Sequence, residues 1–564
     1  MGTLDWVVIG IFFLALIGII VWVVKQKQND SADYFLGGRD ATWLALGAYI
    51  FASNIGSEHL IGLAGAGASS GMAMAHWEIQ GWMILILGWV FVPFYSRSMV
   101  YTMPEFLERR YNPQSRTILS VISLISYVLT KVAVTVYAGG LVFQQVFGIK
   151  ELWGIDFFWI AAIGLVVLTA LYTIFGGMKS VLYTSVLQTP ILLLGSLIIL
   201  VLGFKELGGW DEMMSICSAV TVNEYGDTMT QLIRDNNDPN FPWLGALVGS
   251  AIIGFWYWCT DQFIVQRVLS GKNEKEARRG TIFGAYLKLL PVFLFLIPGM
   301  IAFALHQKYI GAGGEGFLPL LANGTANADA AFPTLVAKLL PAGVKGLVVC
   351  GILAALMSSL ASLFNSSAML FTIDFYKRFK QETPEKKLVG IGQIATVVIV
   401  ILGILWIPIM RSVGDVLYTY LQDVQSVLAP GIAAAFLLGI CWKRTSAKGG
   451  MWGLIAGMII GLTRLGAKVY YSNTAITDSS MFKYLFYDLN WLFFCGWMFL
   501  FCIIVVIAVS LMTEAPSAEK IQGLVFGTST PEQKAATRAS WNHWDIIHTV
   551  IILAITAAFY WYFW

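Results

Sequence analysis

Charged residues are scarce in this sequence. Asp, Glu, Lys and Arg make up 12% of the 564 residues, whereas hydrophobic residues make up 57%. An ordinary soluble domain has about 25% charged residues, so this chain cannot cover a water-facing surface with polar groups. The net charge of +3 provides no strongly basic patch of the kind that nucleic-acid binders carry. We therefore expect a chain that lies in a lipid bilayer and has no nucleic-acid partner.

Cysteines and enzyme motifs are also lacking. The six cysteines lie far apart, and no pair has the spacing of a metal site or of a disulfide framework. The sequence contains no Walker motif, no nucleophile elbow and no metal-ligand pattern. The segments between the apolar runs are too short to bury a core of their own. These absences argue against an enzyme and against a soluble domain.

Long hydrophobic runs are abundant. A helix needs about 20 apolar residues to cross the hydrocarbon core of a bilayer, and about fourteen runs reach that length. The first run lacks the basic start and the cleavage site of a signal peptide, so we expect it to be retained. The sequence predicts an all-α polytopic membrane protein. The expected transmembrane spans are 5–25, 41–66, 78–99, 118–147, 156–175, 181–203, 242–269, 277–306, 345–376, 388–409, 415–440, 448–467, 490–512 and 543–563.

Basic residues alternate between the connections that join these runs. The connection after the third run carries Arg97, Arg109, Arg110 and Arg116, whereas the long connection 204–241 is acidic. The same alternation holds along nearly the whole chain, with Lys and Arg concentrated in the odd-numbered connections. Basic connections stay in the cytoplasm. We therefore expect both termini on the extracellular or periplasmic side.

Several runs contain polar residues at a depth where lipid is expected. Such groups are costly in a membrane and indicate a functional site by default, although serines in membrane helices more often serve close packing. We expect a structural role for Lys131 and an ion pair between Asp261 and a nearby arginine. Lys288 lies so far inside its run that it needs a partner or a water-filled cavity. The polar residues at membrane depth include Ser53, Asn54, Glu58, His59, Glu78, Lys131, Asp261, Gln262, Lys288, Ser358, Ser359, Gln422 and Asp423.

The second run is interrupted by the sequence Ala52-Ser53-Asn54-Ile55-Gly56-Ser57, which is a poor continuous helix. Unwound backbone survives in a membrane only where it lines protein or water. Its freed carbonyl groups, with neighbouring hydroxyls, suit Na⁺ better than a divalent or transition metal. A second interrupted segment, 248–262, lies five runs later. Paired broken helices in corresponding positions indicate a midplane site in an inverted-repeat transporter.

Several short motifs lie between about residues 30 and 450. They are Asp33-Tyr34-Phe35-Leu36-Gly37-Gly38-Arg39, Ala52-Ser53-Asn54-Ile55-Gly56-Ser57-Glu58-His59, Trp256-Tyr257-Trp258-Cys259-Thr260-Asp261-Gln262, Met357-Ser358-Ser359-Leu360-Ala361-Ser362-Leu363-Phe364-Asn365-Ser366 and Trp442-Lys443-Arg444. Together they resemble the sodium/solute symporter family, and the sodium/glucose cotransporter branch in particular. The resemblance implies the leucine-transporter fold, with two inverted five-helix repeats and added outer helices. The expected divisions are a first outer helix with its connection (1–40), the first repeat (41–203), an outside connection (204–241), the second repeat (242–440) and the C-terminal outer helices (441–564).

The same resemblance implies a sodium site and a sugar site. A hexose presents hydroxyls that both donate and accept, and each unpaired group in a dry site costs about 1–3 kcal/mol. The backbone carbonyls and hydroxyls implied for Na⁺ belong to Ala52, Ile55, Ala355, Ser358 and Ser359. The hydrogen-bonding groups implied for the sugar belong to Asn54, His59, Glu78, Lys288 and Gln422, with Tyr257 stacking on the sugar as an inner gate and Trp258 lining the site.

The expected function is symport of a hexose of the glucose or galactose class into the cell, with Na⁺ as the coupling ion and no enzymatic step. Family members with a second sodium site carry an Asp where this sequence has Ser185, and a hydroxyl where it has Ala361. Both changes remove oxygen ligands. We therefore expect one Na⁺ per sugar.

Two alternatives stay open at this point. A polyol such as myo-inositol would suit similar groups, and a sugar-gated sensor or channel would use the same residues without accumulating sugar. Gly81 and Gly254 stand where some relatives place polar side chains near the sugar, so the preferred hexose is also open. The short connection between the last two runs lacks the long insertion of the animal cotransporters, and we expect a bacterial inner-membrane protein. The sequence does not indicate an oligomeric state.

Overall fold

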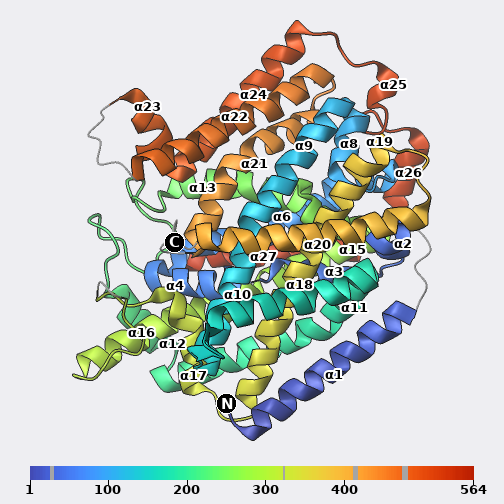
Figure 1. Cartoon of the computed structure of the whole chain (residues 1–564). Coiled ribbons are helices and arrows are strands. Elements are labelled where there is room, and N and C mark those ends of the chain that lie inside the picture. The colour runs from blue at the N-terminus through green and yellow to red at the C-terminus, as the bar shows by residue number, and fades with distance from the viewer. Residues whose placement is uncertain (26–30, 57, 322–323, 411–416, 473–479) are drawn as a thin grey trace.

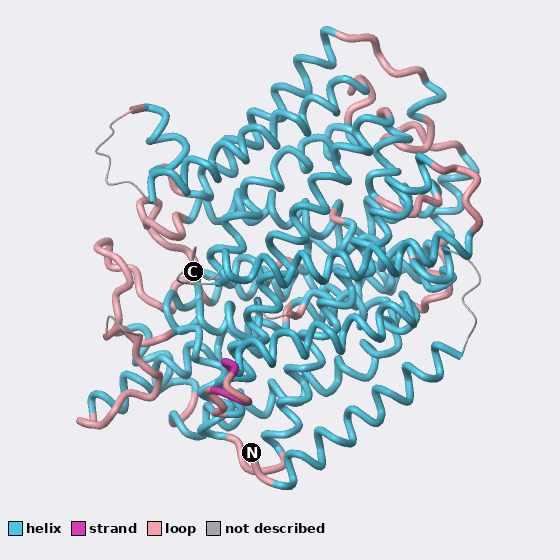
Figure 2. The backbone as a smooth tube through the Cα atoms, in the orientation of Figure 1, coloured by secondary structure: helices cyan, strands magenta, loops and turns pink. Residues whose placement is uncertain are grey.

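The computed structural model describes residues 1–25, 31–56, 58–321, 324–410, 417–472 and 480–564. This part of the chain is almost wholly helical, and its only strands form one short ribbon, β1 (Glu151–Leu152) with β2 (Ile155–Asp156) (Figure 2). Within it, eleven helices are long and apolar enough to cross a membrane. The all-α polytopic architecture is confirmed, whereas the expected number of spans stays a prediction. The start of the span expected at 415–440 lies outside the described residues.

The helices follow one another with mostly short connections (Figure 1); η denotes a short 3₁₀ or π segment. The main elements of the first half are α1 (Thr3–Lys25), α2 (Ser31–Leu36), α3 (Trp43–Asn54), η2 (Glu58–Leu63), α4 (Ala64–Ser70), α5 (Ala75–Glu78), α6 (Gly81–Ile86), α7 (Val92–Ser98), α8 (Met103–Arg110), α9 (Pro113–Ser126), α10 (Ala133–Phe147), α11 (Phe157–Leu207) and α12 (Trp210–Ser218). Those of the second half are α13 (Trp243–Gly254), η6 (Phe255–Thr260), α14 (Gln262–Leu269), α15 (Glu274–Lys288), η7 (Val292–Leu296), α16 (Ile297–Gly311), α17 (Ala331–Leu339), α18 (Val344–Met369), η9 (Leu370–Tyr376), α20 (Glu385–Met410), α21 (Leu417–Cys441), α22 (Ala447–Ser472), α24 (Trp491–Met512), α25 (Ala518–Ile521), α26 (Pro531–Ala539) and α27 (His543–Tyr562).

Both interruptions expected from the sequence are present. Helix α3 ends at Asn54, and Ile55 has extended dihedrals (φ −76°, ψ 106°) before η2 begins. Segment η6 ends in the same way at Asp261 (φ −74°, ψ 129°), whose side chain then accepts a hydrogen bond from the backbone N–H of Phe263 and caps α14. Ser57, in the first interruption, lies outside the described residues. The two breaks free backbone groups at the centre of the protein.

Helix α18 passes through the middle of the protein. It begins the apolar span Val344–Phe379, and 94% of the most hydrophobic 18-residue stretch of this span is buried inside the protein. Helix α11 packs along it and contains two of the expected spans in one element. These halves of α11 are separated at Gly177, whose dihedrals (φ 54°, ψ −152°) only glycine adopts easily. The long buried helix therefore gives the broken helices a fixed surface to pack on.

The outermost helices expose most of their apolar surface. In α1, only 22% of the most hydrophobic 18-residue stretch is buried in the protein, and in α27 the buried share of the corresponding stretch is 17%. Helix α1 runs along one edge of the molecule, and α22 and α24 run along the opposite side (Figure 1). Exposed apolar helices of this kind need lipid as their solvent.

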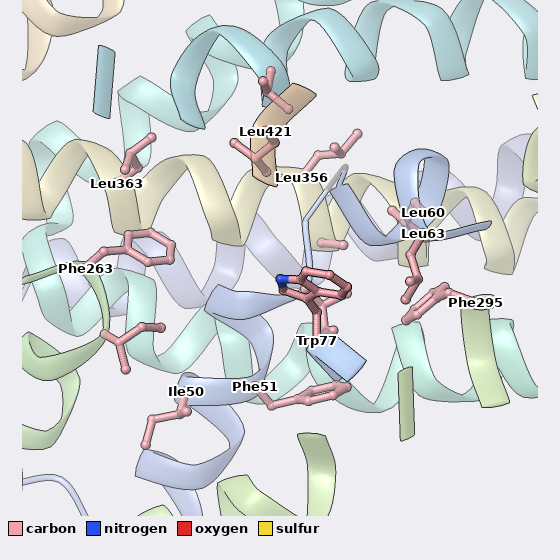
Figure 3. Packing of buried hydrophobic residues seen from close by; sticks show 14 of the residues in the cluster. Ile50, Phe51, Leu60, Leu63, Trp77, Phe263, Phe295, Leu356, Leu363 and Leu421 are labelled. Carbon is pink, nitrogen blue, oxygen red and sulfur yellow. The ribbon is translucent and has the colours of Figure 1, made fainter. Parts of the chain in front are cut away.

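Backbone contact between α4 and α16 holds the first broken helix in place. A Cβ on Gly299 would lie 1.9 Å from the carbonyl oxygen of Ala64, and a Cβ on Gly67 would lie 2.2 Å from that of Leu296. Only glycine permits such an approach, as is common where membrane helices meet. Beside this contact, Leu63 of η2 packs in the same buried cluster as Phe295 of η7 (Figure 3).

Candidate substrate and sodium sites

One central cavity brings together every side chain expected to bind sugar. The cavity has a volume of about 40 Å³. Its walls come from the two broken helices, from α5, α15 and α21, and from the π segment Tyr127–Val132. The expected sugar-binding residues that line it are Asn54, His59, Glu78, Tyr257, Trp258, Lys288 and Gln422.

A buried polar network occupies one wall of the cavity. The ammonium of Lys288 lies 2.6 Å from Oε2 of Glu78 and donates to Oδ1 of Asn54 at 3.2 Å. The amide nitrogen of Asn54 donates to the hydroxyl of Tyr257 at 3.2 Å. His59 approaches the same carboxylate, with Nε2 at 3.3 Å from Oε2 of Glu78. Lys288 thus has the partner that its depth in the membrane requires.

Gln422 and Trp258 complete this part of the cavity. The Oε1 atom of Gln422 is buried and has no hydrogen-bond partner in the described part of the chain. The indole ring of Trp258 has its centroid 5.4 Å from the ammonium of Lys288, within cation–π range. A buried acceptor that lines a cavity without a partner is suited to a polar ligand.

A second buried ion pair lies next to Tyr257. Lys131 contacts Asp261 at 2.7 Å, and its ammonium lies 4.6 Å from the centroid of the Tyr257 ring. The hydroxyl of Tyr127 donates to the same carboxylate. The expectation that Asp261 pairs with an arginine is therefore wrong, because its ion-pair partner is Lys131 of the fourth run. Lys131 forms the ion pair that a structural role requires, and it also lines the cavity.

Arg267 lies nearby with its charge unpaired. Its side chain is fully buried, and none of its three nitrogen atoms has a hydrogen-bond partner within the described ranges. The guanidinium lies 4.3 Å from the ring centroid of Phe263 and 4.9 Å from that of Tyr49. Cation–π contacts offset only part of the cost of burying such a charge.

The side chains and carbonyls expected to bind Na⁺ lie where the break after α3 meets α18. All are buried, and they belong to Ala52, Ile55, Ala355, Ser358 and Ser359. Gly56 lies so close to α18 that a Cβ on it would be 2.9 Å from Oγ of Ser359. Carbonyl and hydroxyl oxygens are hard, neutral ligands, and this set fits Na⁺ better than a divalent ion.

Serine pairs tie α18 to two neighbouring helices at the same level. Ser53 and Ser362 have their hydroxyl oxygens 2.9 Å apart, and so do Ser185 and Ser358. Ser185 stands where family members with a second sodium site carry an Asp, and here it hydrogen-bonds an expected sodium ligand.

The cavity has further lining residues that the resemblance did not supply. These are Glu58, Trp77, Gln80, Lys131, Ile253, Gly254, Leu421 and Gln425. Spacing could have indicated Gln425, which lies almost one helical turn beyond Gln422. A Cβ on Gly254 would lie 2.4 Å from Oε1 of Gln80. The side-chain amide of Gln80 therefore occupies the space that a side chain at position 254 would take. Gly81 instead lies against α15, where a Cβ on it would be 2.9 Å from the carbonyl oxygen of Ala285.

Comparison with known proteins gives a consistent result. The model of the sodium:solute symporter family matches residues 34–457. Sodium/myo-inositol cotransporter 2 of Homo sapiens is 37% identical over 538 residues, which cover 93% of this chain and 79% of that protein. Sodium/glucose cotransporter 1 of Ovis aries is 37% identical over 529 residues, with 90% and 79% covered.

Solved structures also match the fold. A Na⁺-coupled sialic acid symporter superposes with a TM-score of 0.71 at 22% sequence identity, and the match covers 92% of this chain and 99% of that one. This likeness confirms the expected leucine-transporter fold. The family consists of membrane transporters and not of enzymes, and its coupling ion is Na⁺. The chain belongs to the sodium:solute symporter family and is a sodium-coupled solute symporter.

Proposed function

We propose that the protein carries a hexose of the glucose or galactose class into the cell together with one Na⁺, by alternating access. The observation that carries this proposal is the convergence of the expected sugar-binding side chains on one cavity. They supply a carboxylate, an ammonium, amides, an imidazole and aromatic rings. A hexose needs this mixture of donors, acceptors and flat apolar surface in a site that excludes water.

In the proposed sugar site, Glu78 accepts hydrogen bonds from hydroxyls and Lys288 donates them. The amides of Asn54 and Gln422 can do both. Because Lys288 and Glu78 contact each other at 2.6 Å, a bound sugar either bridges them from the cavity side or separates them. Either arrangement replaces polar contacts by other polar contacts, so neither charge is left without a partner.

In the proposed sodium site, the ion binds the carbonyl oxygens at the break of α3 and the hydroxyls of α18. Asn54 lies between the ligands Ala52 and Ile55 in the sequence, and its side chain lines the sugar cavity. An ion that orders this break therefore also positions Asn54 for the sugar. The coupling is reciprocal: sugar must tighten Na⁺ binding by the same factor.

Tyr257 is the proposed inner gate. Its hydroxyl is held by Asn54 at 3.2 Å, and the ion pair of Lys131 with Asp261 packs against it. Release of sugar toward the cytoplasm requires these contacts to part. The proposed orientation places the basic connections in the cytoplasm and both termini outside, in a bacterial inner membrane. The proposed inverted repeats are 41–203 and 242–440, and each contains one of the two broken helices.

A cyclic polyol is the second candidate substrate. Relatives at 37% identity include a sodium/myo-inositol cotransporter as well as a sodium/glucose cotransporter. An inositol ring is close to a hexose in size and also presents hydroxyls around its rim. The same cavity groups would serve it.

Uptake of radiolabelled glucose, galactose and myo-inositol into proteoliposomes tests the substrate. Each is measured under an inward Na⁺ gradient and again with K⁺ in place of Na⁺. We expect Na⁺-dependent uptake of a hexose to exceed that of myo-inositol, to be lost in Gln422→Ala and to persist in Ser218→Ala, an exposed control. Faster uptake of myo-inositol would assign the polyol, and no Na⁺-dependent uptake of any of the three would overturn both assignments.

A further inference from the structure

The carboxylate of Glu58 lines the cavity and makes no ion pair with any described residue. Glu58 begins η2, immediately after the break. The other charged side chains of the lining are paired, Glu78 with Lys288 and Lys131 with Asp261. Within the described residues, Glu58 makes no ion pair and no hydrogen bond, although it is half-buried. The charge of Lys131 acts on this carboxylate without forming an ion pair with it, and a half-buried carboxylate with no direct partner among the described residues is suited to a bound cation or to a ligand hydroxyl.

The same carboxylate lies close to the proposed sodium ligands. The position of a Cβ on Gly56 would be 2.6 Å from Oε2 of Glu58 and 2.9 Å from Oγ of Ser359. These two oxygens therefore crowd one point beside Gly56, from η2 on one side and from α18 on the other. Glu58 borders both sites: its side chain lines the sugar cavity, and its carboxylate approaches the hydroxyl of Ser359.

Charge balance indicates what this arrangement does. The proposed sodium ligands are all neutral oxygens, so bound Na⁺ brings a full positive charge into a buried region. Among the described charged residues of the cavity lining, Glu58 alone makes no ion pair, although the charge of Lys131 acts on it from a greater distance. A nearby opposite charge acts strongly across a few ångströms of protein, where screening is weaker than in water.

We propose that Glu58 couples the sodium site to the substrate site. Its carboxylate compensates the charge of Na⁺ bound beside Ser359 and at the same time accepts a hydrogen bond from a substrate hydroxyl in the cavity. Sodium then holds Glu58 in place for the substrate, and the substrate holds it in place for sodium. The inference rests on the proposed function, because it takes Ser359 as a sodium ligand.

Sodium binding without substrate separates this role from that of a sugar ligand. The thermal unfolding midpoint of the full-length protein in detergent is followed against NaCl, with choline chloride holding the ionic strength constant. For Glu58→Gln, we expect the Na⁺ concentration at half-saturation to rise by about tenfold or more, which corresponds to about 1.4 kcal/mol. Glu58→Asp keeps the charge and is expected to shift it less. Glu519→Gln removes an exposed carboxylate of α25 and is the matched control.

The outcomes are distinct. A raised half-saturation in Glu58→Gln, with unchanged values in Glu519→Gln, supports the coupling role. Wild-type Na⁺ half-saturation in Glu58→Gln overturns it, even if the KM for sugar rises, because Glu58 would then be a substrate ligand only. If Glu58→Gln does not fold, the same titration is made on Glu58→Ala, and a wild-type Na⁺ half-saturation in that variant overturns the coupling role. Absence of any Na⁺ effect in the wild type would overturn the proposed sodium site itself.

Discussion

The ammonium of Lys288 contacts the carboxylate of Glu78 at 2.6 Å, and both side chains are almost completely buried. These charges come from α15 and α5, which lie far apart in the sequence. A buried ion pair is seldom retained for stability alone, because desolvation of the two ions offsets their attraction. At the wall of a cavity, however, the pair offers a strong donor and a strong acceptor to one ligand.

Removing one member of this pair is expected to cost more than removing both. Glu78→Gln or Lys288→Met leaves an uncompensated buried charge, and we expect each to lower the free energy of unfolding by about 3–5 kcal/mol. The double variant Glu78→Gln/Lys288→Met should regain most of this stability and still transport no substrate. Thermal unfolding in detergent and uptake into proteoliposomes measure the two effects. Equal stability losses in the single and double variants would contradict the account.

Tyr257 is expected to gate through its hydroxyl as well as through its ring. Tyr257→Phe keeps the ring but removes the hydrogen bond from Asn54, a loss of about 0.5–1.5 kcal/mol. We expect this loss to weaken the inner gate. In a protein that also carries Phe263→Cys, next to Tyr257, a thiol reagent added on the cytoplasmic side should then label the cysteine faster. Tyr286→Phe, which removes a hydroxyl near His548, should leave this labelling unchanged.

Ser358 and Ser185 are expected to differ in their effect on sodium. Ser358→Ala removes a proposed ligand and should raise the Na⁺ concentration for half-maximal uptake by about tenfold. Ser185→Ala removes only the hydroxyl that holds Ser358 at 2.9 Å, so a change of about two- to fivefold is expected, since a hydrogen bond contributes about 1 kcal/mol or less. A larger effect of Ser185→Ala than of Ser358→Ala would mean that Ser185 itself binds the ion.

Arg267 is expected to destabilise this conformation of the protein. Its buried guanidinium has no hydrogen-bond acceptor within the described residues, and an unsatisfied buried group costs about 1–3 kcal/mol. Arg267→Met keeps much of the volume without the charge. We expect a higher unfolding midpoint and a lower kcat for transport, because this conformation becomes more stable relative to the others of the transport cycle. A variant that unfolds more easily than the wild type would show that Arg267 stabilises this conformation.

The sequence was sufficient for much of the fold and of the candidate site. The weak helix formers around Ile55 correctly located the first break, because unwound backbone in a membrane needs a distinctive local sequence. The segment 248–262 contains the second break only near its end, at Asp261, because Trp243–Thr260 is continuously helical. Several of the polar residues at membrane depth line one cavity, since lipid does not tolerate such groups.

The contacts between distant helices could not be derived in the same way. Nothing local indicates that Asp261 pairs with Lys131 and not with Arg267, because Lys131 comes within reach of Asp261 only after distant helices pack. The position of Glu58 beside Ser359 likewise depends on how closely Gly56 approaches α18. Tertiary packing decides such pairings, and the hydrophobic periodicity of a single run does not indicate how that run packs against the others.

Accumulation of sugar against its own gradient is the most direct test of sodium-driven symport. Proteoliposomes hold equal concentrations of labelled sugar inside and outside, and an inward Na⁺ gradient is imposed with the membrane potential held at zero. The account predicts that internal sugar rises above external sugar, toward the Na⁺ concentration ratio for one Na⁺ per sugar, and falls back when an ionophore dissipates the gradient. Internal sugar that never exceeds external sugar, with Na⁺ entry accelerated by sugar, would contradict symport and assign a sugar-gated channel.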